Sequence, residues 1–378
     1  MQLDYLKMAF ERISRMFKEI RMPPLTRHSL QEVDFWVLIE VKSVRILRVK
    51  VVTHVHALSN FFAEGIFCVC FFVKVTILTT KRTYKTIFKN DVRAEGGRFM
   101  AGFLVVQTDF GLQDGAVNAM YGVAYQVDPT LNINNLTHEI EPYNIHDASY
   151  RLLQAVTYWP AGTVFVSVVD PGVGSTRRSV VAELRGGQYV ITPDNGTLTY
   201  LAQYVGIKEV RQIDEESQRL PGSSESHTFH GRDVYVYNGA RLASGKVSFA
   251  ELGTVIPVSE LVTFPLIAPT QNESKINGTI DITDIRFGSL WTNIPVDFFK
   301  NWQIEYGQSL LVKIYYQGVV RYQDEVVFGR SFAQVSPKEA VLYINSLLNV
   351  GLGINLDSFS TVYKIGTGND WTIELTKI

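Results

Sequence analysis

From Phe103 onward, short apolar runs alternate with longer segments of helical periodicity, and this alternation constrains the fold more than any other feature. The run at 163–169 is apolar at both alternating positions, as expected for a strand that is buried on both faces. Strands that alternate with helices predict an α/β domain with a mostly parallel sheet covered on both faces. The predicted strands and helices occupy, in chain order, residues 103–107, 116–126, 131–136, 145–159 and 163–169.

The C-terminal third follows a different pattern, with apolar residues at every second position. Gly, Asn and Asp separate these segments, which is typical of an all-β domain, and we expect a small barrel. A stretch rich in Pro and polar residues precedes them. We therefore expect a poorly assignable extension, an α/β domain, a linker and a β-barrel domain, which would span residues 1–99, 100–263, 264–277 and 278–378.

Residues 1–99 differ from the rest of the chain in charge. They contain 17 Lys and Arg against 9 Asp and Glu, whereas residues 100–378 contain 19 and 28. The acidic excess of the longer part disfavours nucleic acid as its partner. Cys68 and Cys70 both lie in the first part, so residues 100–378 cannot form a disulfide, which fits a cytoplasmic protein.

The extension itself has three interpretations. Residues 1–21 have the pattern of a basic amphipathic helix. The apolar stretch at 61–80 contains Glu64 and Lys74 and is a poor membrane span, so membrane association is not expected. The extension could also lie outside the native protein, because Ala-Glu-Gly-Gly-Arg-Phe-Met at 94–100 is what a ribosome-binding site would encode in frame. Met100 is then the expected start.

Three polar loops carry the candidate functional residues. Two follow predicted strands: Thr108-Asp-Phe-Gly, and the loop from Asp170 to Arg178 that includes Arg177. Ligands of parallel sheets bind at such strand ends. Asp109 could bind a ribose diol or cap the next helix, and Asp170 with Arg177 could form only a loop salt bridge.

The third loop, Thr228 to Asp233, contains His230, which alone could be structural or catalytic. The histidines also do not indicate a metal site, because His138, His146, His227 and His230 lack the spacing of metal ligands. We therefore expect no metal.

Together, the order and spacing of these loops resemble the S-adenosyl-L-methionine hydroxide adenosyltransferases, relatives of the adenosyl fluorinase and chlorinase. The resemblance runs from about residue 103 to about residue 358. The shared motifs are Thr108-Asp-Phe-Gly, Thr137-His-Glu-Ile, residues 164–174, Pro193-Asp-Asn-Gly, Phe229-His-Gly-Arg-Asp, Phe287-Gly-Ser-Leu-Trp-Thr-Asn-Ile and Asn345-Ser.

The resemblance implies hydrolysis of S-adenosyl-L-methionine to adenosine and L-methionine, by in-line attack of water or hydroxide on the ribose 5′ carbon. Asp170, Arg177 and His230 would position the water. The halogenases carry a Tyr and a Thr-rich loop for halide in place of Asp170 and Arg177, and Tyr and Ser in place of His230 and Gly231. No cofactor is implied. A non-catalytic protein that binds S-adenosylmethionine or adenosine, and a halogenase, remain as alternatives.

The resemblance also implies how the two halves of the substrate are held. Two residues depart from the family pattern: Ser289 replaces an Asn that touches adenine, and Leu347 replaces the carboxylate-binding Arg of the halogenases. The recognition of the methionine carboxylate therefore stays open. The implied contacts are Asp109 with the ribose hydroxyls, Tyr143 and Phe229 as walls, Phe287 and Trp291 around the adenosyl group, Ser289 and Asn355 at adenine, Asp284 with the methionine ammonium and Ser346 with its carboxylate.

Family members also resemble one another in forming trimers. Their active site lies between the first domain of one chain and the second domain of its neighbour. The resemblance thus implies a homotrimer here, with Asp109, Asp170 and His230 of one chain facing Asp284 and Ser346 of another.

Overall fold

The computed structural model describes residues 35–36, 50–51 and 102–378. Strands β1 (Phe35–Trp36) and β2 (Lys50–Val51) pair antiparallel. The expectations for a helix at 1–21, for the apolar stretch at 61–80 and for a start at Met100 lie outside the described residues.

The first large sheet contains seven strands in the order β4-β3-β5-β7-β6-β8-β9. The four neighbouring strands β4, β3, β5 and β7 are parallel, while β6, β8 and β9 each run antiparallel to the strand before them in the order. The predicted α/β fold with a mostly parallel core is thus confirmed. The strands are β3 (Phe103–Thr108), β4 (Asn132–Thr137), β5 (Val164–Val168), β6 (Ser179–Leu184), β7 (Tyr189–Pro193), β8 (Ile207–Ile213) and β9 (Gly253–Ile256).

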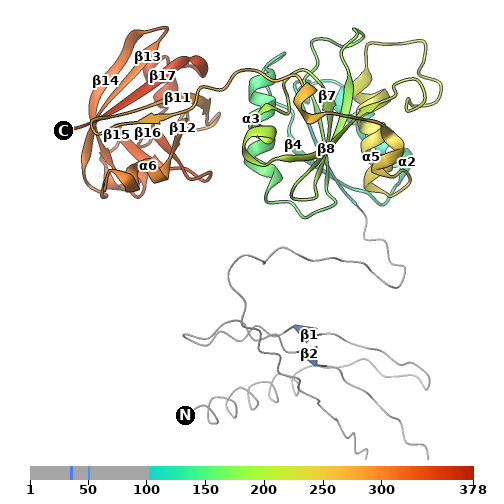
Figure 1. The fold of residues 1–378 in the computed structure, drawn as a ribbon, viewed down its shortest axis with the longest axis horizontal. Coiled ribbons are helices and arrows are strands. Elements are labelled where there is room, and N and C mark those ends of the chain that lie inside the picture. The colour runs from blue at the N-terminus through green and yellow to red at the C-terminus, as the bar shows by residue number, and fades with distance from the viewer. Residues whose placement is uncertain (1–34, 37–49, 52–101) are drawn as a thin grey trace, which may run out of the picture. The chain divides into compact units, whose positions relative to one another are not determined.

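Helices cover both faces of this sheet, because successive strand residues point to opposite sides. Leu104 and Val106 of β3 pack in the core beneath α2 (Ala116–Val127) and α5 (Tyr237–Ala243). Val105 points the other way, into the core beneath α3 (Ile145–Val156) and α4 (Thr199–Tyr204). Figure 1 shows α3 on one side of the strands and α2 with α5 on the other. The shorter helical segments of this part are η1 (Gly231–Val236), η2 (Phe249–Leu252) and η3 (Val258–Glu260).

The second sheet closes into a barrel, as predicted. Its seven barrel strands follow the order β11-β12-β16-β15-β14-β13-β17, and β17 pairs with β11 to close the ring, with β10 paired to β11 outside it. One apolar core fills the interior. The elements of this part are β10 (Thr270–Gln271), β11 (Lys275–Thr283), β12 (Leu290–Pro295), α6 (Val296–Asn301), β13 (Ser309–Tyr316), β14 (Val319–Phe328), η4 (Phe332–Gln334), β15 (Ala340–Ile344), β16 (Asn349–Ile354), α7 (Phe359–Tyr363) and β17 (Gly368–Lys377).

Strand β11 contacts the helical layer of α3 and α4. Arg151 of α3 donates a hydrogen bond to the carbonyl oxygen of Thr283 at 3.0 Å. Ile282 forms an apolar cluster with Tyr150 and Tyr200, and Leu347 packs against the same cluster. Leu347 therefore has an apolar packing role in this chain.

Within the described residues, no helix combines the length and the apolar composition that a membrane span requires.

Candidate active site

The site is built at one edge of the α/β sheet. Strands β3, β5 and β8 run in the same direction, so their carboxyl ends share this edge. Asp109, Asp170 and Glu215 follow these three ends within two residues, and Arg177 lies just before β6 begins at the same edge. The topology therefore gathers three carboxylates and one guanidinium from distant parts of the chain.

A pocket with a volume of about 270 Å³ opens at this edge. Five of the predicted site residues line it: Asp109, Tyr143, Asp170, Phe229 and His230. Its other walls are largely apolar, so a ligand inside would be shielded from water on several sides. The residues that line the pocket but were not predicted are Phe110, Pro142, Val168, Val173, Thr228 and Gly231.

Asp109 does not cap the following helix, so the capping alternative is wrong. Its Oδ2 accepts a hydrogen bond from the backbone N–H of Tyr143 at 2.9 Å, whereas Asp114 accepts from the backbone N–H of Ala116 at the helix start. Tyr143 has a φ of 72°, which is uncommon for a residue with a side chain, and its side chain is 72% exposed. Burial raises the pKa of Asp109, while the Tyr143 hydrogen bond opposes this rise. Asp109 and Tyr143 are thus fixed together at the mouth of the pocket.

Asp170 and Arg177 do form a salt bridge, of which Asp170 lines the pocket while Arg177 lies behind it. Arg177 Nε donates to Asp170 Oδ1 at 3.0 Å and Arg177 Nη2 donates to Asp170 Oδ2 at 2.6 Å, a two-pronged pairing that fixes both planar groups. The side chains are 10% and 6% exposed. Burial alone would lower the pKa of Arg177, but the hydrogen bond to Asp170 and neighbouring negative charges raise it. Arg177 is therefore a permanent, buried cation beside the pocket.

His230 lies at the start of η1, a six-residue π-helix, and is 2% exposed. π-helical turns occur frequently at functional sites, since they redirect the side chains at their ends. Arg177 Nη2 lies 2.8 Å from Nδ1 of His230, so one guanidinium joins Asp170 and His230. Burial lowers the pKa of His230, and the charges of Arg177 and Arg219 lower it further, against the opposite effects of Glu215 and Asp170. Burial and the two arginines thus favour the uncharged form of the ring.

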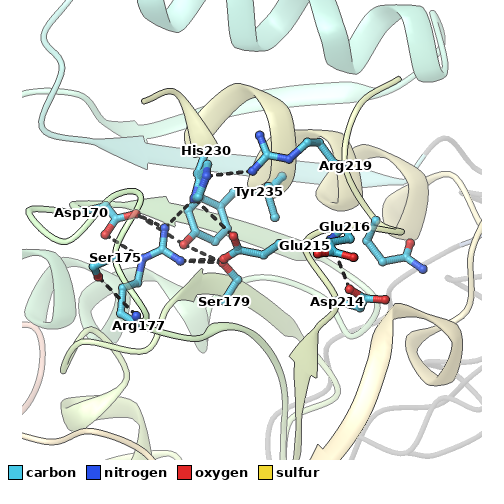
Figure 2. A network of polar contacts seen from close by, with 12 residues as sticks. Asp170, Ser175, Arg177, Ser179, Asp214, Glu215, Glu216, Arg219, His230 and Tyr235 are labelled. Carbon is cyan, nitrogen blue, oxygen red and sulfur yellow. Dashed lines mark hydrogen bonds and ion pairs between the residues drawn. The ribbon is translucent and has the colours of Figure 1, made fainter. Parts of the chain in front are cut away.

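Four further residues complete this polar network (Figure 2). Glu215 Oε1 accepts hydrogen bonds from Arg177 Nη1 at 2.8 Å and from Ser179 Oγ at 2.5 Å, and Ser179 Oγ lies 2.9 Å from the Tyr235 hydroxyl. Arg219 Nη2 lies 2.8 Å from Nε2 of His230. Burial alone would raise the pKa of Glu215, but the Ser179 hydrogen bond and the charge of Arg177 lower it.

Sequence reasoning missed Ser179, Glu215, Arg219 and Tyr235. None of them lies in a motif, and each acts on the pocket through another side chain. A signal existed for Glu215 alone: it follows a strand whose direction places its end beside Asp109 and Asp170. That direction depends on β6 running antiparallel, which the apolar pattern does not reveal.

The six predicted residues of the barrel part do not line this pocket in the described chain. Asp284, Phe287, Ser289 and Trp291 lie in or beside the turn between β11 and β12. Within that turn, Asp284 Oδ1 accepts the backbone N–H groups of Arg286 and Phe287, and Phe287 is 71% exposed. Ser289 is buried, and Trp291 Nε1 donates to the Tyr343 hydroxyl at 3.0 Å.

The other two barrel residues flank strand β16. Ser346 precedes the strand and is exposed, and its carbonyl oxygen accepts a hydrogen bond from Tyr158 at 3.4 Å. Asn355 follows the strand and donates from its side chain to the carbonyl of Val335 at 2.8 Å. The structure therefore divides the predicted site residues into two sets. The pocket set is Asp109, Tyr143, Asp170, Phe229 and His230, with Arg177 beside them, and the barrel set is Asp284, Phe287, Ser289, Trp291, Ser346 and Asn355.

Histidines elsewhere serve the scaffold. His138 is buried with Nδ1 2.8 Å from Thr108 Oγ1 and Nε2 2.8 Å from the Tyr121 hydroxyl, and burial lowers its pKa to about 4. It thus braces the end of β3 next to Asp109. Within the described part of the chain, no three His, Cys, Asp or Glu side chains are grouped so as to hold a metal ion.

Comparison with known families agrees with this geometry. Residues 104–253 match the SAM hydroxide adenosyltransferase N-terminal domain, and residues 278–372 match the SAM hydroxide adenosyltransferase C-terminal domain.

Among curated proteins, the chain is similar to the (R)-S-adenosyl-L-methionine hydrolase of Methanocaldococcus jannaschii, with 34% identity over 61% of this chain and 80% of that protein. It is also similar to the Fluorinase of Actinopolyspora mzabensis, with 26% identity over 70% of this chain and 94% of that protein. Among solved structures, an uncharacterized conserved protein from Thermotoga maritima superposes with a TM-score of 0.65 at 29% identity, over 72% of this chain and all of that one.

Proposed function

The chain belongs to the SAM hydroxide adenosyltransferase family, and from this premise we propose that it hydrolyses S-adenosyl-L-methionine to adenosine and L-methionine. The observation that carries the proposal is the buried Arg177, which pairs with Asp170 and contacts His230, two residues that line one pocket together with Asp109. The relatives are named for the (R) form of the sulfonium, and we propose the same substrate here.

The substrate brings its own leaving group. The positive sulfur makes the ribose 5′ carbon electrophilic, and methionine departs as a neutral thioether that takes the electron pair of the broken carbon–sulfur bond. No covalent intermediate or cofactor is required. The enzyme must supply an aligned and activated water.

The pocket residues supply these two requirements. The cationic Arg177 favours the hydroxide form of a nearby water, because opposite charges attract strongly in a buried site. The proton that the water gives up passes to the pair formed by Asp170 and His230, both of which line the pocket. Asp109 holds the ribose hydroxyls, and Tyr143 and Phe229 enclose the ribose and adenine.

The barrel set belongs, in this proposal, to the site of a neighbouring chain in a homotrimer. Its support is that Asp284, Ser289 and Ser346 lie apart from the pocket set in one chain, while Tyr143 and Phe287 expose large apolar surfaces in the two sets. Exposed apolar groups of this size are commonly covered by a ligand or a partner. Phe287, Trp291 and Asn355 would then complete the adenosyl site from the adjacent chain.

A cytoplasmic location also belongs to the proposal. It is supported by the absence of cysteine from residues 100–378.

A product assay tests the function. The purified full chain is incubated separately with the (R) and (S) sulfonium forms of the substrate, with and without chloride or fluoride, and products are identified by mass. We expect adenosine and methionine in equal amounts without halide. Binding without adenosine would identify a non-catalytic binder, and a halogenated adenosine that requires halide would identify a halogenase; either result would overturn the proposal.

A further inference from the structure

The imidazole of His230 is contacted by a guanidinium at each of its two nitrogens. Arg177 Nη2 lies 2.8 Å from Nδ1, and Arg219 Nη2 lies 2.8 Å from Nε2. Figure 2 shows the ring between these two arginines, with Glu215 nearby. The Arg219 contact comes from a different part of the chain than the loop of Asp170 and Arg177.

Counting donors and acceptors shows what this arrangement requires. A guanidinium only donates hydrogen bonds, and a neutral imidazole has one nitrogen that accepts and one that donates. A protonated imidazole accepts at neither nitrogen. The two arginines therefore compete for one lone pair, so only one of the two contacts is a hydrogen bond in the neutral ring, and adding a proton would remove that hydrogen bond as well.

The chain holds Arg219 in place from both sides. The carbonyl oxygen of Gln218 accepts a hydrogen bond from Asn238 of α5 at 2.7 Å, and the backbone N–H of Leu220 donates to the carbonyl of Asp233 in η1 at 2.8 Å. The Arg219 side chain also donates to the carbonyl of Ser226 at 3.2 Å. The contact with His230 is thus anchored to the same helical segment, η1, that follows His230.

The charges around the ring come from several elements. Glu215 Oε2 lies 3.6 Å from Nδ1, and Asp170 is bound to the same Arg177 that contacts this nitrogen. The His227 ring lies 6.4 Å from the His230 ring, centroid to centroid. Arg177 forms ion pairs with Asp170 and Glu215, whereas Arg219 pairs with no carboxylate of the described residues, so its charge acts on His230 without that compensation.

We propose that Arg219 is a positioning residue of the active site, which holds the His230 ring at its second nitrogen and keeps that ring uncharged. Arg219 does not line the pocket and acts only through His230. The inference rests on the proposed function, in which the pair formed by Asp170 and His230 takes the proton of the attacking water, so that His230 must start uncharged. Loss of the Arg219 charge should make His230 easier to protonate. As the pH falls, activity should then be lost at a higher pH than in the unmodified chain.

The test compares Arg219→Gln and Arg219→Met with Arg219→Lys and with Arg321→Gln, which removes an exposed arginine from β14 of the barrel. Turnover is measured from about pH 5 to 9, and the titration of His230 is followed by NMR of histidine-labelled full chain, with its signal assigned by its loss in His230→Asn. We expect both neutral variants to move the acid limb of kcat and the His230 titration upward by about one pH unit, with KM changed less than about twofold. Arg219→Lys and Arg321→Gln should leave both curves near those of the unmodified chain.

Wild-type curves in both Arg219→Gln and Arg219→Met would overturn the inference, as would equal shifts in Arg321→Gln. A fall in kcat at every pH, with no shift of the His230 titration, would also overturn the inference, because it would indicate a merely structural role. If the unmodified chain releases no adenosine, the proposed function fails, while the NMR titration still decides whether Arg219 controls the charge of His230.

Discussion

At the scale of single residues, the site depends on ion pairs and hydrogen bonds that fix its charged side chains in position. Arg177 satisfies both oxygens of Asp170 and also reaches Glu215 and His230, so its position is over-determined. Such fixed charges need no reorganisation as the reaction proceeds, which is the main electrostatic advantage of an enzyme over water.

Replacing Asp170 by Asn tests this account. The amide keeps the shape but cannot accept a proton, and it leaves Arg177 without its closest counter-charge. We expect kcat to fall by on the order of a hundredfold or more, with KM changed little. Steady-state kinetics against Asp324→Asn, an exposed carboxylate of β14, provides the comparison. Equal turnover in both variants would refute the role of Asp170.

Resemblance to the family singled out residues that the structure brings together, and their roles remain predictions. Asp109, Tyr143, Asp170, Phe229 and His230 line one pocket, with Arg177 bonded to two of them. Glu215 and Arg219 could not be predicted in the same way, because charged loop residues are ordinarily solvated and only their distances to Arg177 and His230 distinguish them.

At the scale of helices and strands, the sequence predicted most of what positions the site. Short apolar runs and helical periodicity placed the first strands and helices of the sheet within a few residues of their observed bounds. The antiparallel insertion of β6 and the π-helix η1 were not predictable, since neither changes the local apolar pattern. Both matter, because β6 sets the direction of β8 and η1 begins directly after His230.

Strand β11 places a carboxylate where it meets the helical layer of the α/β part. Asp281 is 6% exposed, accepts a hydrogen bond from Thr279 at 2.7 Å and another from Tyr200, and faces His146. Burial raises its pKa from 3.8 to about 6, against the effects of these three neighbours. The folded protein therefore binds this proton more tightly than the unfolded chain does.

This pKa predicts a pH dependence of stability. The contribution of protonated Asp281 is fully present below about pH 4 and is lost as the pH rises through about 6. Asp281→Asn cannot ionise, so its free energy of unfolding relative to the unmodified chain should rise by on the order of 2–3 kcal/mol between pH 4 and 7. Denaturant titrations at several pH values measure this, with the exposed Asp297→Asn as control. Parallel curves for Asp281→Asn and the unmodified chain would contradict it.

At the scale of the whole molecule, the chain combines an α/β sheet with a closed barrel, and both classes were predicted. Closure of the barrel depends on pairing between β11 and β17, which lie about 90 residues apart, and on the parallel pair β14 and β15. Such long-range pairings leave no local signal, so the strand order could not be predicted. The domain limits at 100–263, 264–277 and 278–378 remain predictions; β10 and the start of β11 fall within the predicted linker.

The proposed trimer makes a prediction at this scale. Asp170→Asn damages the pocket set and Asp284→Ala damages the barrel set, so each variant alone should be nearly inactive. If the sets join between chains, co-expression of the two variants should restore up to about a quarter of the sites, because each site then draws its halves independently. Activity of the mixed protein is compared with that of the separate variants. No recovery in trimers shown to be mixed would place both sets in one chain's site.

The central claim is that a water positioned by Asp170, Arg177 and His230 attacks the ribose 5′ carbon. Hydrolysis in oxygen-18 water, followed by fragmentation of the product in a mass spectrometer, tests it most directly. The account predicts one labelled oxygen in the 5′ hydroxyl of adenosine and none in methionine. Unlabelled adenosine, or label in methionine, would contradict it.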